Sequence, residues 1–376
     1  MSIDPDDVGP LLEEVSSFAK ARIGGAVTRP EEPLPIAELE NLTREALELG
    51  MLPTGGEAGF GLWESCDQPH DMEFNIGVLR HVARANVGVA FAWHRQALAR
   101  CLERSLGAAP AGDDLFGTIL APTGHYGLAR NSLARWLAGS EQGGDEFHLL
   151  ADWLDRRTHV TSFVAPESWK FLLWPVWHEG DVLWQRVSRD NVWVRELRFQ
   201  HGFDEVCAYQ ILNASGEGQT WQVGGGVSRQ LYARILKLDM LGLLAIGSGG
   251  MARGLELARE YASIRKQGGK RIDRHPAVQR MLSDVEQACR NADLALHACA
   301  QPVDELDLGL VAASRANIHE MLCMAANQVV QVHGGIGYMR DAGAEKLLRD
   351  MNMLKLQTGG TREIGAFLAG WFGDYE

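Results

Sequence analysis

A glycine cluster and an arginine are the residues of this sequence best suited to hold a phosphate-containing ligand. Gly334 and Gly335 follow a long apolar stretch with helical spacing, and glycine lets an anion approach backbone N–H groups with no Cβ in the way. Arg265 ends another helical stretch, and a guanidinium can bind a phosphate through two parallel hydrogen bonds. Taken singly, these residues are equally compatible with an ordinary turn and a solvated arginine.

A second glycine cluster, from Gly247 to Ala252, matches the letters of the dinucleotide fingerprint GxGxxG/A. That fingerprint needs a strand before it and a helix that opens at the glycines. Residues 238–265 read instead as one helix with small residues on a packing face, so we expect packing here. The sequence also lacks a Walker loop, a GxSxG elbow, an HxxxH pair and a CxxC pair, which argues against nucleophilic and metal-dependent hydrolysis.

Three successive regions must position these groups. Apolar residues recur at helical spacing over residues 36–49 and 74–106, which predicts a helical domain over residues 1–115. Residues 116–226 contain short runs rich in aromatic and β-branched residues between Gly, Asp, Asn and Ser, a pattern typical of a β domain. Helical spacing returns at Ser228 and continues, which predicts a helical domain over residues 227–376.

Composition narrows the classes of partner. The 376 residues carry 36 Lys+Arg against 49 Asp+Glu, a net charge of -13, which disfavours nucleic acid and anionic membranes. No stretch of about 18 apolar residues stands out, and the six cysteines have no metal-site spacing. We therefore expect a cytoplasmic protein with reduced thiols, no metal and no membrane contact.

Two ordered segments make the sequence resemble the acyl-CoA dehydrogenase family. The first is AREYASIRKQGGKRI with HPAVQ after it (residues 258–279), and the second is QVHGGIGY, EKLLRD and GGTREI (residues 331–364). The resemblance implies an α+β fold with an N-terminal helical domain, a middle β-barrel or sandwich, and a C-terminal four-helix bundle. It also implies FAD as cofactor, an acyl-CoA or other acyl thioester as substrate, and an electron-transfer flavoprotein as oxidant.

The same resemblance assigns residues to the cofactor. Arg265 and Gln267 would reach the FAD of a neighbouring subunit. The family's flavin strand, Trp-x-Thr-Asn/Ser, corresponds to His159-Val-Thr161-Ser162, so the threonine is kept and an imidazole replaces the indole. The remaining positions implied for the FAD site are Gln331, Gly334, Gly335, Thr361 and Glu363.

The resemblance also locates the catalytic base. Most members carry a glutamate just before the Gly-Thr of the last motif, where this chain has Gly359. A minority place a glutamate 26 residues before the arginine of the first motif, and that position is Asp239. Burial would raise the pKa of such a carboxyl toward the working pH, although aspartate is about 1.5 Å shorter than glutamate. A helix-terminal acid without catalytic function is an equal alternative. Met240 and Gly268 replace an arginine and a phenylalanine usual in the family.

Three functions remain open on these grounds. The first is FAD-dependent α,β-dehydrogenation of an acyl thioester by a homo-oligomer, with Asp239 as base. The second is a non-catalytic subunit of a heterotetramer that completes the FAD site of a related chain. The third is altered flavin chemistry on the same fold.

Overall fold

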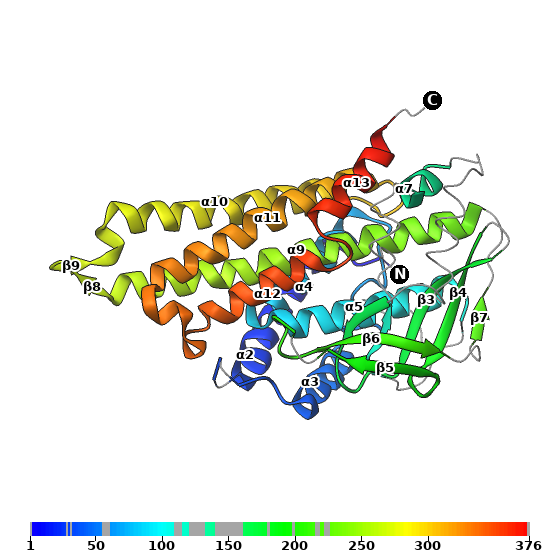
Figure 1. Cartoon of the computed structure of the whole chain (residues 1–376), viewed down its shortest axis with the longest axis horizontal. Coiled ribbons are helices and arrows are strands. Elements are labelled where there is room, and N and C mark those ends of the chain that lie inside the picture. The colour runs from blue at the N-terminus through cyan, green and yellow to red at the C-terminus, as the bar shows by residue number, and fades with distance from the viewer. Residues whose placement is uncertain are drawn as a thin grey trace.

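The structure is a computed structural model of the whole chain, and its elements follow the order helices, strands, helices (Figure 1). The predicted α+β fold is confirmed, and the domain boundaries at 115 and 226 stay predictions. The residues that the structure describes are 2–27, 29–30, 32–54, 61–108, 115–119, 132–139, 161–178, 181–197, 200–214, 219–221 and 226–373.

The N-terminal region is built from helices that cover the bundle on one side (Figure 1). Their bounds are η1 Pro5–Asp7, α1 Val8–Phe18, η2 Ala19–Ile23, α2 Gly24–Ala26, α3 Ile36–Glu48, α4 Pro69–Ala85 and α5 Val87–Ser105. Asn86 lies between α4 and α5. Its side-chain oxygen accepts a hydrogen bond from the backbone N–H of Val89 and so caps the N-terminus of α5.

The middle region contains two sheets and a short helix, α7 Ser132–Leu137. One sheet has the order β1-β3-β4-β7 and the other the order β2-β6-β5. Their strands are β1 Gly117–Ile119, β2 Thr161–Ala165, β3 Phe171–His178, β4 Asp181–Ser188, β5 Val192–Glu196, β6 Cys207–Ala214 and β7 Gln219–Trp221, with a 3-10 turn η3 at Arg189–Asn191. All strand pairs are antiparallel except β1 with β3.

The C-terminal region is a bundle of long helices around α9. Its elements are α9 Gly226–Ile264, β8 Lys266–Gln267, β9 Lys270–Arg271, η4 Ile272–Arg274, α10 Pro276–Cys299, α11 Leu308–His333, η5 Gly334–Tyr338, η6 Arg340–Ala342, α12 Ala344–Leu356 and α13 Thr361–Phe372. The expectation of unbroken helical structure here is wrong at β8–β9. Gly268 and Gly269 have φ of +58° and +77°, as a two-residue type I′ hairpin turn requires, and glycine adopts such angles without strain.

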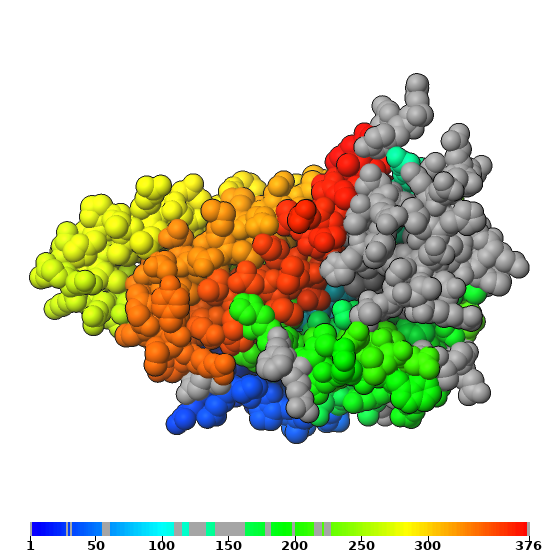
Figure 2. Space-filling model, in the orientation of Figure 1, coloured from blue at the N-terminus to red at the C-terminus, as the bar shows by residue number. Residues whose placement is uncertain are grey.

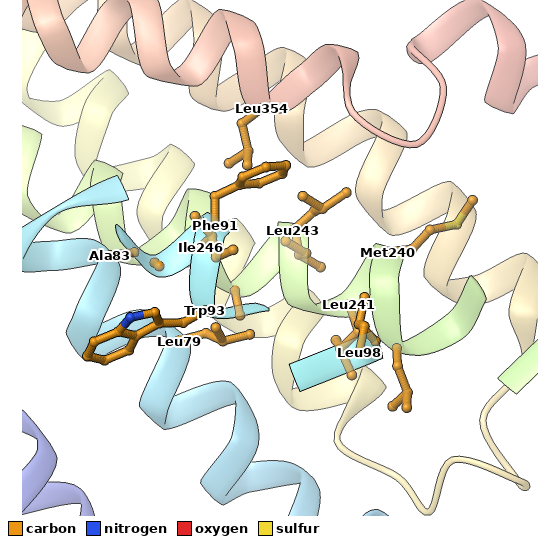
Figure 3. Close-up of a cluster of buried hydrophobic side chains, with 14 of the residues drawn as sticks. Leu79, Ala83, Phe91, Trp93, Leu98, Met240, Leu241, Leu243, Ile246 and Leu354 are labelled. Atoms are coloured by element: carbon orange, nitrogen blue, oxygen red, sulfur yellow. The ribbon is translucent and has the colours of Figure 1, made fainter. Parts of the chain in front are cut away.

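Part of the buried apolar core lies where α4, α5, α9 and α12 meet (Figure 3). Met240, which replaces an arginine usual in the family, is fully buried there. The cluster Gly247–Ala252 lies inside α9 as predicted, and a Cβ on Gly249 would be 2.3 Å from the carbonyl oxygen of Arg80. This glycine therefore lets the backbones of α4 and α9 approach each other.

Helix α9 also corrects the expectation that no apolar stretch is long enough to cross a membrane. Its residues Val227–Ile264 meet that criterion by length and composition. However, 89% of the most apolar window is buried inside the protein. The apolar character of α9 is accounted for by its place at the centre of the bundle.

Candidate functional site

Asp239 lies at the centre of a buried polar network built from three parts of the chain. The network joins α9 to α5 and to the turn between α12 and α13. His94 Nε2 is 3.1 Å from Asp239 Oδ1. Arg95 donates a hydrogen bond to Asp239 Oδ2 at 3.0 Å, and the same guanidinium nitrogen lies 2.9 Å from Oδ1 in an ion pair. The hydroxyl of Thr358 donates to Oδ2. Asp239 and His94 are fully buried, and Arg95 and Thr358 are 3% exposed.

Contacts around His94 fix the protonation of its ring. Trp63 Nε1 is 3.0 Å from His94 Nδ1, and an indole N–H can only donate. Nδ1 is therefore the acceptor, and Nε2 carries the proton that is donated to Asp239. A Cβ on Gly242 would be 2.1 Å from the His94 ring, so the glycine gives the imidazole access to α9.

The environment of Asp239 shifts the pKa of its carboxyl in the direction opposite to the predicted one. Burial by itself raises the pKa of a carboxyl. The charge of Arg95 and the hydrogen bonds from His94 and Thr358 outweigh burial and hold the pKa of Asp239 well below its usual range. The expectation of a raised pKa is therefore wrong, and Asp239 is an ionised, ion-paired carboxylate in this structure.

Arg315 on α11 holds the turn that carries Thr358. Its guanidinium donates to the carbonyl oxygens of Gly359 at 2.8 Å and of Gln357, and burial lowers its pKa to about 10. The turn has left-handed backbone at Thr358 and Gly359, with φ of +55° and +83°. A non-glycine residue in that region costs roughly 1–2 kcal/mol, so the Arg315 contacts offset strain at Thr358.

The residues assigned to FAD by resemblance lie at two ends of the bundle. Arg265 and Gln267 are exposed at the β8–β9 hairpin. Gln331, Gly334 and Gly335 are exposed at the end of α11, which is the same end because the Tyr261 and His333 rings stack at 4.7 Å.

The backbone at the end of α11 is open to solvent. Gly334 has φ of +61°, and a Cβ on either Gly334 or Gly335 would have no neighbour within 4 Å. Gln331 Nε2 donates to the hydroxyl of Tyr338 at 2.9 Å. An anion could therefore approach this turn from outside the chain, although these residues alone do not enclose it.

Thr361 and Glu363 lie in the first turn of α13, away from that end. The Thr361 hydroxyl donates to Glu320 on α11 at 2.8 Å, and Glu320 precedes Gln331 by about 16 Å along that helix at ~1.5 Å per residue. His159 lies outside the described residues. Thr161 is the first residue of β2, and the structure describes its backbone alone.

The separation along α9 limits how these residues can cooperate. Asp239 lies on α9, which runs from Gly226 to Ile264, and Arg265 directly follows the last residue of that helix. At ~1.5 Å per residue they are about 39 Å apart. A single flavin dinucleotide cannot contact both residues of one chain, so any site that uses both must join two chains.

Sequence reasoning missed His94, Arg95, Thr358 and Arg315. A signal was present for the first two, because His94-Arg95 interrupts an otherwise apolar run in α5. No local pattern singled out Thr358 or Arg315. Among the described residues, no group of three or more His, Cys, Asp or Glu side chains is placed to hold a metal ion.

Comparisons with known proteins agree with this architecture. The sequence family described as "Acyl-CoA dehydrogenase, C-terminal domain" matches residues 230–367. The chain is similar to 3-sulfinopropanoyl-CoA desulfinase of Paraburkholderia xenovorans, with 34% identity over 174 residues that cover 46% of this chain and 42% of the relative. It is also similar to the caffeyl-CoA reductase-Etf complex subunit CarC of Acetobacterium woodii, with 31% identity over 146 residues, 38% of each chain.

The curated relatives are thus matched over less than half of their length. Across the whole fold, butyryl-CoA dehydrogenase from Megasphaera elsdenii superposes with a TM-score of 0.71 and 14% identity, covering 98% of each chain. The order of helices, strands and helices and the whole-chain superposition show that this chain has the fold of an acyl-CoA dehydrogenase. Within that fold, residues 230–367 match the C-terminal domain of the acyl-CoA dehydrogenase family.

Proposed function

We propose that this chain is an FAD-dependent oxidoreductase that removes hydrogen from the α and β carbons of an acyl thioester, with each FAD held between two copies. The observation that carries the proposal is the separation of about 39 Å between Asp239 and Arg265 on α9. Residues assigned to one cofactor then come from two chains, and the exposed position of Arg265 leaves its side chain accessible to a second chain. An electron-transfer flavoprotein as oxidant is supported by the name of the Etf complex relative.

FAD is the cofactor that similarity to this family implies, and the described residues fit half of its site. Arg265 is exposed and forms no salt bridge within the described part of the chain, so its guanidinium is available to a pyrophosphate. The open backbone at Gly334 and Gly335 offers N–H groups to the same kind of anion. Arg265 and Gln267 would hold FAD from one chain, and Thr361 and Glu363 would close the site of the other. Bound FAD would accept the hydride from the β carbon.

Asp239 is the candidate base in this proposal. Among the described residues it is the fully buried carboxylate that touches the turn before Thr361. A carboxylate with a lowered pKa is a weak base, and each pKa unit corresponds to about 1.4 kcal/mol. We therefore expect Asp239 to accept a proton only when a bound acyl thioester draws the Arg95 guanidinium away from it.

The ion pair between Asp239 and Arg95 favours a second candidate function, that of a non-catalytic subunit. If the pair stays closed, neither Asp239 nor Gly359 supplies a base. The chain would then complete the FAD site of a related subunit that carries its own glutamate. Chemistry without α-proton removal is a variant of this case, and one relative is named as a desulfinase.

Flavin content and reduction distinguish the candidates. The chain is purified alone and its absorbance is recorded from 300 to 550 nm, and flavin reduction by saturated acyl thioesters is then followed by single-turnover stopped flow. The first candidate predicts bound flavin, reduction by the native chain, and loss of reduction in Asp239→Asn with ligand binding preserved. Asp284→Asn, the same change at an exposed position on α10, is the matched control. Unchanged reduction in Asp239→Asn excludes this residue as base, and flavin bound only after co-expression with a related chain supports the second candidate.

A further inference from the structure

Two buried arginine side chains, one from α5 and one from α11, hold the turn between α12 and α13. Arg95 donates to the hydroxyl of Thr358 at 3.1 Å. Arg315 donates to the carbonyl oxygens on either side of that residue, those of Gln357 and Gly359. Arg95 is 3% exposed and Arg315 is 1% exposed. The two guanidinium groups therefore contact one short turn in a region with almost no access to water.

The charges of this network do not balance. Asp239 pairs with Arg95 at 2.9 Å, whereas Arg315 forms no salt bridge with any residue that the structure describes. The pKa of Arg315 is about 10, which leaves its guanidinium charged at neutral pH. The imidazoles of His94 and His319 add no charge there, because burial lowers the pKa of both. Two buried cations against one buried carboxylate leave an excess of one positive charge.

Arg315 also has a donor without an acceptor. Its Nε atom is buried and has no hydrogen-bond partner within the described part of the chain. Buried N–H groups almost always have a partner, and a buried charge without a counter-ion is costly. Gly359, in the turn that Arg315 holds, has no side chain and supplies no compensating charge. An anion is therefore the group that this network lacks.

The proposed function needs an anion at the same place. Asp239 can accept a proton only when Arg95 is drawn away from it, and a guanidinium leaves a buried carboxylate most readily for another oxyanion of similar geometry. A neutral acyl chain offers Arg95 no such partner. An acyl chain with its own carboxylate would replace Asp239 as the partner of Arg95, and it would bring the buried charges to two cations and two anions.

The two cations lie close to one outer face of the molecule. Helices α12 and α13 are exposed on the face shown in Figure 2, in orange and red, and the turn between them carries Thr358. Leu356, just before this turn, is 58% exposed, whereas Thr358 is 3% exposed. Displacement of this short turn would open a path from that face to both guanidinium groups.

We propose that the substrate is an acyl thioester whose acyl chain carries a second anionic group, a carboxylate or a comparable oxyanion, which binds to Arg95 and Arg315. The inference rests on the proposed function and names the substrate class of that site. Arg95 lies 2.9 Å from Asp239 Oδ1, and a reacting carbon lies about 3–3.5 Å from its base. An oxyanion bound to the same guanidinium is then within about 9 Å of the α carbon, which favours short acyl chains.

Isothermal titration calorimetry with two CoA thioesters of equal chain length tests the substrate class. Adipyl-CoA and hexanoyl-CoA have the same number of acyl carbons and differ at the far end, which is a carboxylate in the first and a methyl group in the second. Because CoA is common to both, any difference in affinity comes from the acyl end. For the full chain at pH 7 without an electron acceptor, we expect a dissociation constant about 10–100-fold smaller for adipyl-CoA.

Substitutions at Arg95 test which side chain binds the anion. Arg95→Gln combined with Asp239→Asn removes both charges of the ion pair, so that no buried carboxylate is left unpaired, and should reduce the preference for adipyl-CoA about tenfold. Arg95→Lys keeps the charge but loses the paired N–H groups of the guanidinium, so it should retain part of the preference. Arg290→Gln, which removes an exposed arginine on α10, is the matched control and should keep the full preference. Circular dichroism shows that each variant is folded.

Three results would overturn this inference. They are equal dissociation constants for the two thioesters, no binding of adipyl-CoA, and a full preference for adipyl-CoA in the folded double variant. If either Arg95 variant does not fold, the two thioesters decide the matter on the native chain.

Flavin reduction on the same samples separates this inference from the proposed function. Equal affinities together with flavin reduction by hexanoyl-CoA refute the second anionic group alone. Preferential binding of adipyl-CoA by a chain that holds no flavin supports the anion site and refutes dehydrogenation by this chain.

Discussion

Replacement of Arg95 by methionine would leave the buried Asp239 carboxylate without its cation and so destabilise the fold. Arg95 contacts both oxygens of that carboxylate within 3.0 Å, its side chain is 4% exposed, and the carboxylate is fully buried. Removal of one partner from such a pair typically costs about 3–5 kcal/mol. We therefore expect Arg95→Met to lower the free energy of unfolding by that amount near pH 8.

The effect should depend on pH in a defined direction. In the native chain the pKa of Asp239 is lowered, so its stabilising contribution is complete above about pH 4 and is lost below it. In Arg95→Met the carboxyl stays buried without a cation, which raises its pKa above about 4. Protonation then relieves the buried charge, so the destabilisation is smaller at pH 5 than at pH 8.

Urea denaturation at pH 5 and pH 8 measures both effects. The exposed substitution Arg290→Met is the control, and Asp239→Asn added to Arg95→Met should recover part of the lost stability because the buried charge is gone. A loss below about 1 kcal/mol, equal at both pH values, would refute the buried ion pair. Asp239 would then be free to act as a base without displacement of Arg95.

Three further predictions follow from contacts described above. Arg265→Ala should reduce the FAD content per chain, measured by absorbance, and should leave the thermal midpoint of the flavin-free protein unchanged, measured by calorimetry. Full FAD occupancy in this variant argues against a role of Arg265 between chains. Gly249→Ala should lower the free energy of unfolding, measured by urea denaturation, by about 1–3 kcal/mol because the added Cβ meets the Arg80 backbone. At Gly365 an added Cβ has no neighbour within 4 Å, so Gly365→Ala should raise the free energy of unfolding by roughly 0.5–1 kcal/mol. Burial lowers the pKa of His319 to about 3, so stability should fall by up to about 1.4 kcal/mol per pH unit below ~6.5, and His319→Gln should flatten that slope.

The fold was predictable where the pattern of apolar residues is long and regular. Helices α4, α5, α10 and α11 follow from such patterns, and the interpretation of Gly247–Ala252 as helix followed from unbroken helical spacing on both sides. The β8–β9 hairpin was missed although Gly268-Gly269 is a recognised turn pair, because helical residues on both sides dominated the interpretation.

The candidate site was less predictable because its parts come from distant segments. The position of Asp239 followed from family spacing, but its environment depends on Arg95, 144 residues earlier, and Thr358, 119 residues later. Burial and a neighbouring cation shift a carboxyl pKa in opposite directions, and the sequence gives no information about the second effect. Arg315 was missed for the same reason, since it acts on backbone carbonyls that carry no sequence signal.

The burial of α9 has a consequence for synthesis of the chain on the ribosome. Helix α9 is apolar enough to resemble a membrane segment, and α11 is one of the helices that pack on it. The end of α11 at His333 is translated about 70 residues after α9 ends, or roughly 3–14 s later at ~5–20 residues per second. During that interval one face of α9 lacks its native cover, so the nascent chain at this stage is a natural substrate for chaperones that bind exposed apolar helices.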